Sequence, residues 1–348
     1  MSRKTRTFAL TATAVAAALT LAACSGSSSD ASGSTAEEGF GDLSIQLTWI
    51  KNAEFAGEYF AMENGYFEEA GFSEVNLLAG PGATESIVLS GEALVGLSSP
   101  VAVAPVILEE GAPLKIIGTT YQKNPFTIVS LPSAPIDAPE DMVGKKIGVQ
   151  AGGNETLFEA LLEANGIDPE SVETVPVEYD PSVLVNGEVE GFFGYVTNEL
   201  LTLELGGHEP HSLPFADNGL PFIAESFVVT QDSIDTNREA LKAFLYAEIL
   251  GWKDALADPE ESARLAVEVY GADLGLDPEK ELQQAIAQNE QLVVTEETDA
   301  NGLFTISNEL IDANIEILAL AGYDIAADQL FDMSLLAEVY EEHPELLN

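Results

Sequence analysis

The 348-residue chain carries 59 Asp and Glu residues but only 13 Lys and Arg residues, so its formal net charge at pH 7 is −46. A surface this acidic repels nucleic acid and anionic lipid headgroups, which argues against both as binding partners. Hydrophobic residues make up 46% of the chain, which indicates a globular protein long enough for two lobes with their own cores. We attribute the acidity to solubility in a salty medium.

Residues 1–23 have the layout of a secretory signal peptide, with three basic residues before an apolar run over residues 8–21. The run is too short to span a bilayer comfortably. Residues 21–24, Leu-Ala-Ala-Cys, resemble the bacterial lipobox, in which the cysteine becomes the lipidated first residue; an ordinary signal peptide is the alternative. We therefore expect lipidation at Cys24, a flexible tether over residues 24–42, and an extracytoplasmic protein anchored by lipid to the cell membrane.

From residue 43, short β-rich runs alternate with helical patterns, which predicts parallel sheets with crossover helices. The predicted strands cover residues 44–50, 75–79, 93–97, 114–121, 146–150, 172–177 and 189–195. The predicted helices between them cover residues 55–64, 83–90, 101–110, 155–165 and 198–205. After residue 230 the pattern changes to amphipathic helices at 235–257, 259–270, 278–291 and 307–321, followed by a helical tail that we expect to pack on the first lobe.

Basic residues are scarce between positions 42 and 230, where there are five lysines and no arginine. A pocket formed by this region cannot use a bidentate arginine clamp on a carboxylate, sulfonate or phosphate. A helix N-terminus could still bind an anion there. The composition therefore favours a neutral or cationic ligand.

His208 and His211 are close in sequence, and their spacing could suggest a metal site. Their segment is loop-like and broken by proline, and Cys24, the only cysteine of the chain, belongs to the predicted lipidation site. We expect neither a metal nor a cofactor.

Three segments carry a family resemblance. Residues 47–67 (LTWIKNAEFAGEYFAMENGYF), 91–100 (GEALVGLSSP) and 141–149 (DMVGKKIGV) resemble the ABC-importer substrate-binding proteins for thiamine pyrimidine precursors, riboflavin, nitrate, sulfonates and taurine. The tryptophan-led first segment is similar to the pyrimidine-precursor and riboflavin branch. Residues 194–199 (GYVTNE) resemble a motif of the same branch, although Leu200 stands where a proline is common.

The resemblance implies an α/β fold of the two-lobe periplasmic-binding-protein type II class, with two mixed sheets, crossover helices and a hinge of two crossing segments. We expect residues 43–126 and 229–348 to form lobe 1 and residues 127–228 to form lobe 2. The crossings are expected near 124–130 and 224–230. Ligands of such sheets bind outside the carboxyl ends of strands, where the lobes close over them.

Candidate ligand-binding residues follow these strand ends. The resemblance implies that Trp49 stacks on a planar heterocycle and that Glu199 accepts hydrogen bonds from ring or exocyclic N–H groups. Each has a plainer interpretation: Trp49 as a core residue, and Glu199 as a carboxylate favoured at a helix N-terminus. The glycine turn at 80–82 can present backbone N–H groups, and Thr84 is either a ligand contact or an ordinary N-cap. The full expected set is Trp49, Asn52, Glu54, Tyr59, Thr84, Ser86, Ser99, Tyr121, Asn154, Tyr195, Asn198 and Glu199.

The predicted function is a monomeric, lipid-anchored receptor that passes a small heteroaromatic solute, a thiamine pyrimidine precursor or a riboflavin-like molecule, to an ABC permease. One alternative is the same role for a sulfonate or nitrate. Another is an enzyme, because the family resembles a pyrimidine synthase. That synthase carries a cysteine-rich motif, which is missing here.

Overall fold

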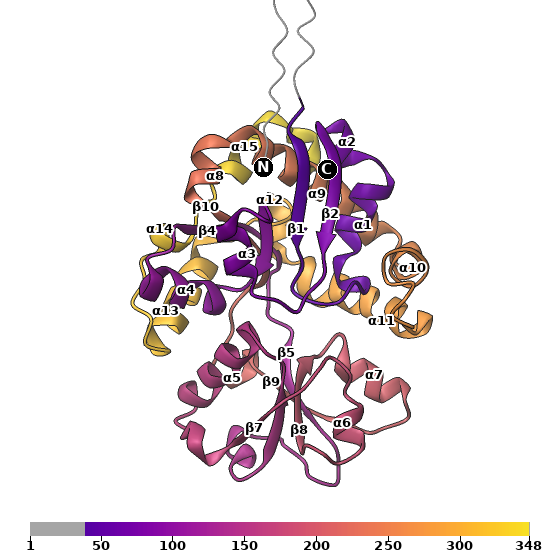
Figure 1. Cartoon of the computed structure of the whole chain (residues 1–348), viewed down its shortest axis with the longest axis vertical. Helices are drawn as coiled ribbons and strands as arrows, with labels where there is room; N and C mark the ends of the chain where they lie inside the picture. Colours follow the sequence, from indigo (N-terminus) through magenta and orange to yellow (C-terminus); the bar gives the residue numbers. More distant parts are fainter. Residues whose placement is uncertain (1–38, 348) are drawn as a thin grey trace, which may run out of the picture. The chain divides into compact units, whose positions relative to one another are not determined.

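The computed structural model describes residues 39–347, so the predicted signal peptide and Cys24 lie outside the described residues. Residues 39–347 contain two five-stranded mixed sheets, each covered by helices (Figure 1). We call the two sheets with their helices lobe 1 and lobe 2. This is the mixed, two-lobe α/β architecture that the sequence predicts. Within residues 39–347 no helix is both long and apolar enough to span a lipid bilayer.

The sheet of lobe 1 has the strand order β2-β1-β3-β10-β4. The strands β1 to β3 run parallel, whereas β10 is antiparallel to both of its neighbours. Ser226 of β10 lies opposite Ser98 of β3 on one side and Thr119 of β4 on the other. The strands are β1 (Gly41–Gln46), β2 (Phe72–Leu78), β3 (Val95–Ser98), β4 (Leu114–Tyr121) and β10 (Ala224–Thr230).

Helices from both ends of the described chain cover the sheet of lobe 1. The helices that precede β10 in the sequence are α1 (Ala56–Glu63), α2 (Tyr66–Glu69), α3 (Thr84–Ser90) and α4 (Pro100–Glu110). Those after β10 are α8 (Gln231–Thr236), α9 (Arg238–Ala257), α10 (Pro259–Arg264), α11 (Pro278–Gln288), α12 (Glu296–Asn301), α13 (Asn308–Leu320), α14 (Ala327–Leu330) and α15 (Ser334–Glu342). The C-terminal helix α15 contacts α9 and β4.

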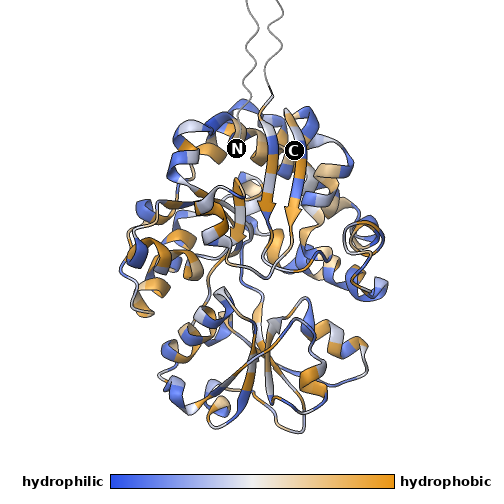
Figure 2. Cartoon of the chain, in the orientation of Figure 1, coloured by the Kyte–Doolittle hydropathy of each residue, from blue (hydrophilic) through white to orange (hydrophobic). Residues whose placement is uncertain are grey.

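The sheet of lobe 2 has the order β7-β6-β8-β5-β9. Its strands are β5 (Phe126–Ser130), β6 (Lys146–Val149), β7 (Glu173–Pro176), β8 (Gly191–Tyr195) and β9 (His211–Pro214). Its helices are α5 (Gly153–Ala164), α6 (Ser182–Val185) and α7 (Glu199–Leu205). Apolar residues run along inner strands of both lobes (Figure 2), and β3, β5 and β8 are buried along nearly their whole length.

Two short links join the sheets. The first, residues 122–125, connects β4 to β5, and the second, residues 219–223, precedes β10. Both links begin a few residues before the crossings expected from the sequence. Residues 224–228, which the sequence assigns to lobe 2, are paired in the sheet of lobe 1.

Local sequence explains why helices begin where they do. Ser99 caps α4 by accepting a hydrogen bond from the backbone N–H of Ala102, and Pro100 occupies the first helical position. An N-cap of this kind contributes about 1 kcal/mol. The helix ends at Gly111, which adopts the left-handed conformation (φ 69°) that glycine tolerates. This cap fixes Ser99 at the carboxyl end of β3.

Most expected elements lie within a few residues of the observed ones. The strands β5, β9 and β10 were not among the predicted strands, and β5 and β10 occupy the segments expected as crossings. The short helices α2, α6 and α12 were not predicted either. The helix expected at 235–257 is divided at Asn237 into α8 and α9. The helix expected at 259–270 continues from α10 into a π-helical turn at Leu265–Tyr270.

Candidate functional site

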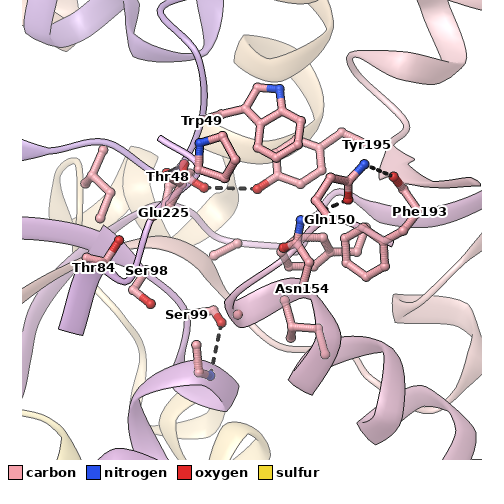
Figure 3. Close-up of a pocket in the computed structure, with 18 of the residues that line it drawn as sticks. Thr48, Trp49, Thr84, Ser98, Ser99, Gln150, Asn154, Phe193, Tyr195 and Glu225 are labelled. Carbon is pink, nitrogen blue, oxygen red and sulfur yellow. Dashed lines mark hydrogen bonds between the residues drawn. The ribbon is translucent and has the colours of Figure 1, made fainter. Parts of the chain in front are cut away.

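A cavity lies between the lobes, at the carboxyl ends of strands from both sheets (Figure 3). It encloses about 720 Å³ of space between atoms, including its open mouth. Lobe 1 supplies the residues that follow β1, β2 and β3 and the start of β10, while lobe 2 supplies the ends of β6 and β8, with Phe126 at the start of β5 and Asn198 and Glu199 at the start of α7. None of the residues lining this cavity is Lys, Arg or His.

Trp49 follows β1 and forms part of the lobe 1 wall. Its side chain is partly buried and packs against the core, and it also lines the cavity. The indole Nε1–H is buried but has no hydrogen-bond partner among the described residues. A buried N–H without a partner is costly to the folded state.

Glu199 is buried at the start of α7, where backbone and side-chain donors hold it from two sides. The backbone N–H of Tyr195 donates to Oε2 at 2.8 Å, and Asn198 Nδ2 donates to Oε1 at 2.8 Å. Burial raises the pKa of Glu199 to about 7, although the Tyr195 hydrogen bond and the nearby Lys280 charge oppose the rise. A Cβ on Gly194 would lie 2.8 Å from Oε2 of Glu199, so glycine is needed there to make room for the carboxylate.

Glu225 is a cavity residue that sequence reasoning missed. It is 3% exposed and accepts hydrogen bonds from Thr48 Oγ1 at 2.8 Å and from the Tyr195 hydroxyl at 3.1 Å. Burial raises its pKa to about 7, while these two hydrogen bonds act in the opposite direction. Its backbone is left-handed, with φ at +49°, which is uncommon for a residue with a side chain. Tyr195 belongs to lobe 2 and Glu225 to lobe 1, so this bond joins the lobes.

Amide and aromatic side chains complete the lobe 2 wall. Asn154 Nδ2 donates to Gln150 Oε1 at 3.1 Å, and Gln150 Nε2 donates to the Phe193 carbonyl at 3.0 Å (Figure 3). The rings of Phe126 and Tyr195 meet edge to face, with centroids 5.0 Å apart. Gln150 and Phe193 were not among the expected ligand contacts, although Gln150 ends the strand expected at 146–150.

The structure brings seven of the twelve expected residues together in the cavity: Trp49, Thr84, Ser99, Asn154, Tyr195, Asn198 and Glu199. The other five, Asn52, Glu54, Tyr59, Ser86 and Tyr121, do not line it.

Four of those five are held inside lobe 1. Asn52 caps the short 3-10 helix Ala53–Phe55, and its carbonyl accepts a hydrogen bond from the Tyr59 hydroxyl at 2.9 Å. The Tyr121 hydroxyl donates to Gln288 Oε1 at 2.8 Å. Glu54 is buried by the same 3-10 turn. Ser86 is exposed on α3.

Three glutamates form a buried acidic group inside lobe 1, which we call the interior carboxyls: Glu54, Glu58 and Glu248. Burial raises the pKa of Glu54 well above its usual range, and the charges of Glu225 and Glu199 raise it further. Burial also raises the pKa of Glu58 to about 8 and that of Glu248 well above normal. Glu58 is therefore largely protonated near neutral pH, and burial favours the protonated form of Glu54 and Glu248 as well.

A second cavity adjoins the first and shares Trp49, Asn198 and Glu199 with it. Its wall includes Lys280 of α11, which pairs with Glu281 at 3.0 Å. The stretch without arginine covers residues 42–230, and Lys280 lies beyond it, in a C-terminal helix that reaches the site. Among residues 39–347, no group of three or more His, Cys, Asp or Glu side chains is arranged to hold a metal ion.

Comparison with known proteins agrees with this architecture. The chain is 27% identical over 233 residues to the formylaminopyrimidine-binding protein of Halalkalibacterium halodurans, covering 65% of this chain and 70% of that one. It is 27% identical over 237 residues to the riboflavin-binding protein RibY of Chloroflexus aurantiacus, covering 65% and 66%. It is also 24% identical over 229 residues to a 4-amino-5-hydroxymethyl-2-methylpyrimidine phosphate synthase of Legionella pneumophila, covering 64% and 72%.

Among solved structures, the periplasmic nitrate-binding protein NrtA of Synechocystis PCC 6803 superposes with a TM-score of 0.63 at 15% identity, covering 88% of this chain and 91% of that one. This likeness shows a shared fold. The family model described as "NMT1/THI5 like" matches residues 52–262, which is more than half of the chain. The chain therefore belongs to the NMT1/THI5-like family.

Proposed function

We propose that this protein is an extracytoplasmic, lipid-anchored solute receptor of an ABC importer. It captures a small heteroaromatic molecule, a thiamine pyrimidine precursor or a riboflavin-like solute, by closing its lobes, and delivers it to the permease. One observation carries the proposal: an interlobe cavity without any basic side chain, in which Trp49 and Glu199 share the wall.

The cavity chemistry suits a flat ring with N–H groups. An aromatic side chain beside a planar ligand contributes about 0.5 to 1.5 kcal/mol beyond burial. Glu199 already accepts two hydrogen bonds from the protein, and a carboxylate has about four acceptor positions. Ring or exocyclic N–H groups can therefore bind the remaining ones.

The same features disfavour a sulfonate or nitrate as the solute. An oxyanion placed in this cavity would face Glu85, Glu199 and Glu225 without a cation in the lining to balance its charge. Uncompensated burial of like charges is strongly unfavourable. Lys280 lies in the adjoining cavity and is already paired with Glu281.

Isothermal titration calorimetry tests this function directly. Purified protein is titrated with 4-amino-5-hydroxymethyl-2-methylpyrimidine, riboflavin, an alkanesulfonate and nitrate, each with and without added sulfate. We expect the pyrimidine or riboflavin to bind, with little effect of sulfate. Binding of only the sulfonate or nitrate, weakened by sulfate, would favour the anion alternative.

Two further measurements test whether the protein leaves its solute unchanged and whether it carries a lipid anchor. Incubation of the purified protein with the bound heterocycle, followed by mass spectrometry, should return it unchanged. A new product would favour an enzyme, as the name of the Legionella relative suggests. Metabolic labelling with a radioactive fatty acid should label the native chain and not the Cys24→Ser variant.

A further inference from the structure

Glu225 occupies an unusual position at the boundary between the lobes. It begins the antiparallel strand β10, immediately after the link that returns the chain to lobe 1. Its backbone lies in the left-handed region (φ 49°), which is strained for a residue with a side chain, and such residues cluster at functional sites. In this conformation the carboxyl group lines the cavity and remains almost fully buried (Figure 3).

Tyr195 sets the distance between Glu225 and Glu199. Its backbone N–H donates to Glu199, and its hydroxyl donates to Glu225. The two carboxyl groups therefore lie at opposite ends of one tyrosine residue, a length comparable with that of a substituted six-membered ring. A solute lying alongside Tyr195 can contact both.

Glu225 has capacity for a further donor. Thr48 and Tyr195 supply one hydrogen bond to each of its oxygens, which leaves acceptor positions unfilled. The protein supplies no cation to this carboxyl within the cavity, because the lining contains no Lys, Arg or His. Burial raises the pKa of the neighbouring Glu54 carboxyl, and this group supplies no positive charge to Glu225 either.

We propose that Glu225 is a second ligand-binding carboxylate, which selects solutes that carry a positively charged amino or amidine nitrogen at the end away from Glu199. This inference rests on the proposed function and narrows its solute class. The preferred solute is a flat heterocycle with a cationic arm, and not a ring bearing only neutral substituents.

A matched pair of ligands tests the inference by calorimetry at pH 7. The two probes are 4-amino-5-aminomethyl-2-methylpyrimidine, which is cationic, and its neutral 5-hydroxymethyl counterpart. Because a hydrogen bond to a charged group contributes about 1.5 to 3 kcal/mol, we expect the native protein to bind the aminomethyl compound at least tenfold more tightly. Equal affinities, or a preference for the neutral compound, would overturn the inference.

The variant Glu225→Gln keeps the shape of the side chain and removes its charge. We expect the preference for the cationic probe to fall to about twofold or less, whereas the exposed control Glu92→Gln keeps the native preference. A preference that persists in a folded Glu225→Gln protein would also overturn the inference. If neither pyrimidine nor riboflavin binds the native protein, the proposed function itself fails; if the probes bind without a charge preference, only the role of Glu225 fails.

Discussion

Two groups of buried glutamates in this protein have the same side chain and similar burial but different surroundings. The cavity carboxyls, Glu199 and Glu225, each accept two hydrogen bonds from the protein. The interior carboxyls have unpartnered oxygens among the described residues: both oxygens of Glu54 and Glu248 and one of Glu58.

The difference shows how hydrogen bonding decides what a buried carboxyl can do. Donors directed at Glu199 and Glu225 favour the charged form and hold their pKa values near 7, so they can act as acceptors for a ligand. Burial raises the pKa of the interior carboxyls Glu54 and Glu248, and their unpartnered oxygens receive no hydrogen bond that would oppose this rise. We therefore expect the first group to control ligand binding and the second to control how stability depends on pH.

Among the predicted changes in ligand affinity, the largest is expected for Glu199→Ala. Loss of the acceptor should weaken binding of the heterocycle by about ten- to a hundredfold, because a hydrogen bond to a charged group is removed. Calorimetry measures the change, and Glu92→Ala, an exposed residue, is the matched control. Trp49→Ala should show a similar loss. Unchanged binding in both cavity variants would contradict the site.

A smaller loss of affinity for the heterocycle, roughly tenfold, is expected for Gly194→Ala. The added Cβ would lie 2.8 Å from Glu199 Oε2 and must displace the carboxylate from the backbone N–H of Tyr195. The thermal midpoint should also fall, because the added Cβ would lie 2.9 Å from the Cβ of Glu199 and the start of α7 must shift to make room. An affinity equal to that of the native protein would show that the position of Glu199 is not critical.

Glu58→Gln tests the interior group. Because the folded pKa of Glu58 is raised to about 8, the folded state binds more protons than the unfolded state between about pH 4.5 and 8, and its contribution to stability is lost as pH rises through this range. The variant stays neutral, so its thermal midpoint should fall less than that of the native protein between pH 6 and 8.5. Parallel pH profiles would contradict a protonated interior Glu58.

The smallest change in ligand affinity is expected for Thr48→Val. This change removes one donor from Glu225 and leaves the Tyr195 hydroxyl in place. A single hydrogen bond contributes about 1 kcal/mol, so affinity for the cationic pyrimidine should fall roughly fivefold. A loss as large as that for Glu199→Ala would show that Thr48 contacts the solute itself.

The sequence predicts much of the architecture because the signals are local. Alternating β-rich and helical runs define the strands, and Ser99 and Gly111 mark the limits of α4. Cavity residues such as Trp49, Asn154 and Glu199 directly follow strands, so their position in the chain suffices to place them near a strand end.

The remaining site residues depend on tertiary structure. Glu54 lies close in sequence to Trp49, but a 3-10 turn directs it into lobe 1. Tyr121 bonds to Gln288, which is far along the chain, and no local pattern reports that pairing. Glu225 lies in an expected crossing segment, and its left-handed backbone and its bond to Tyr195 arise only when the lobes meet.

A crystal structure of the protein with its solute bound tests the central claim most directly. The account predicts a planar heterocycle beside the Trp49 indole, with N–H groups donating to Glu199. An oxyanion bound between the lobes away from Trp49, with no donor at Glu199, would contradict it.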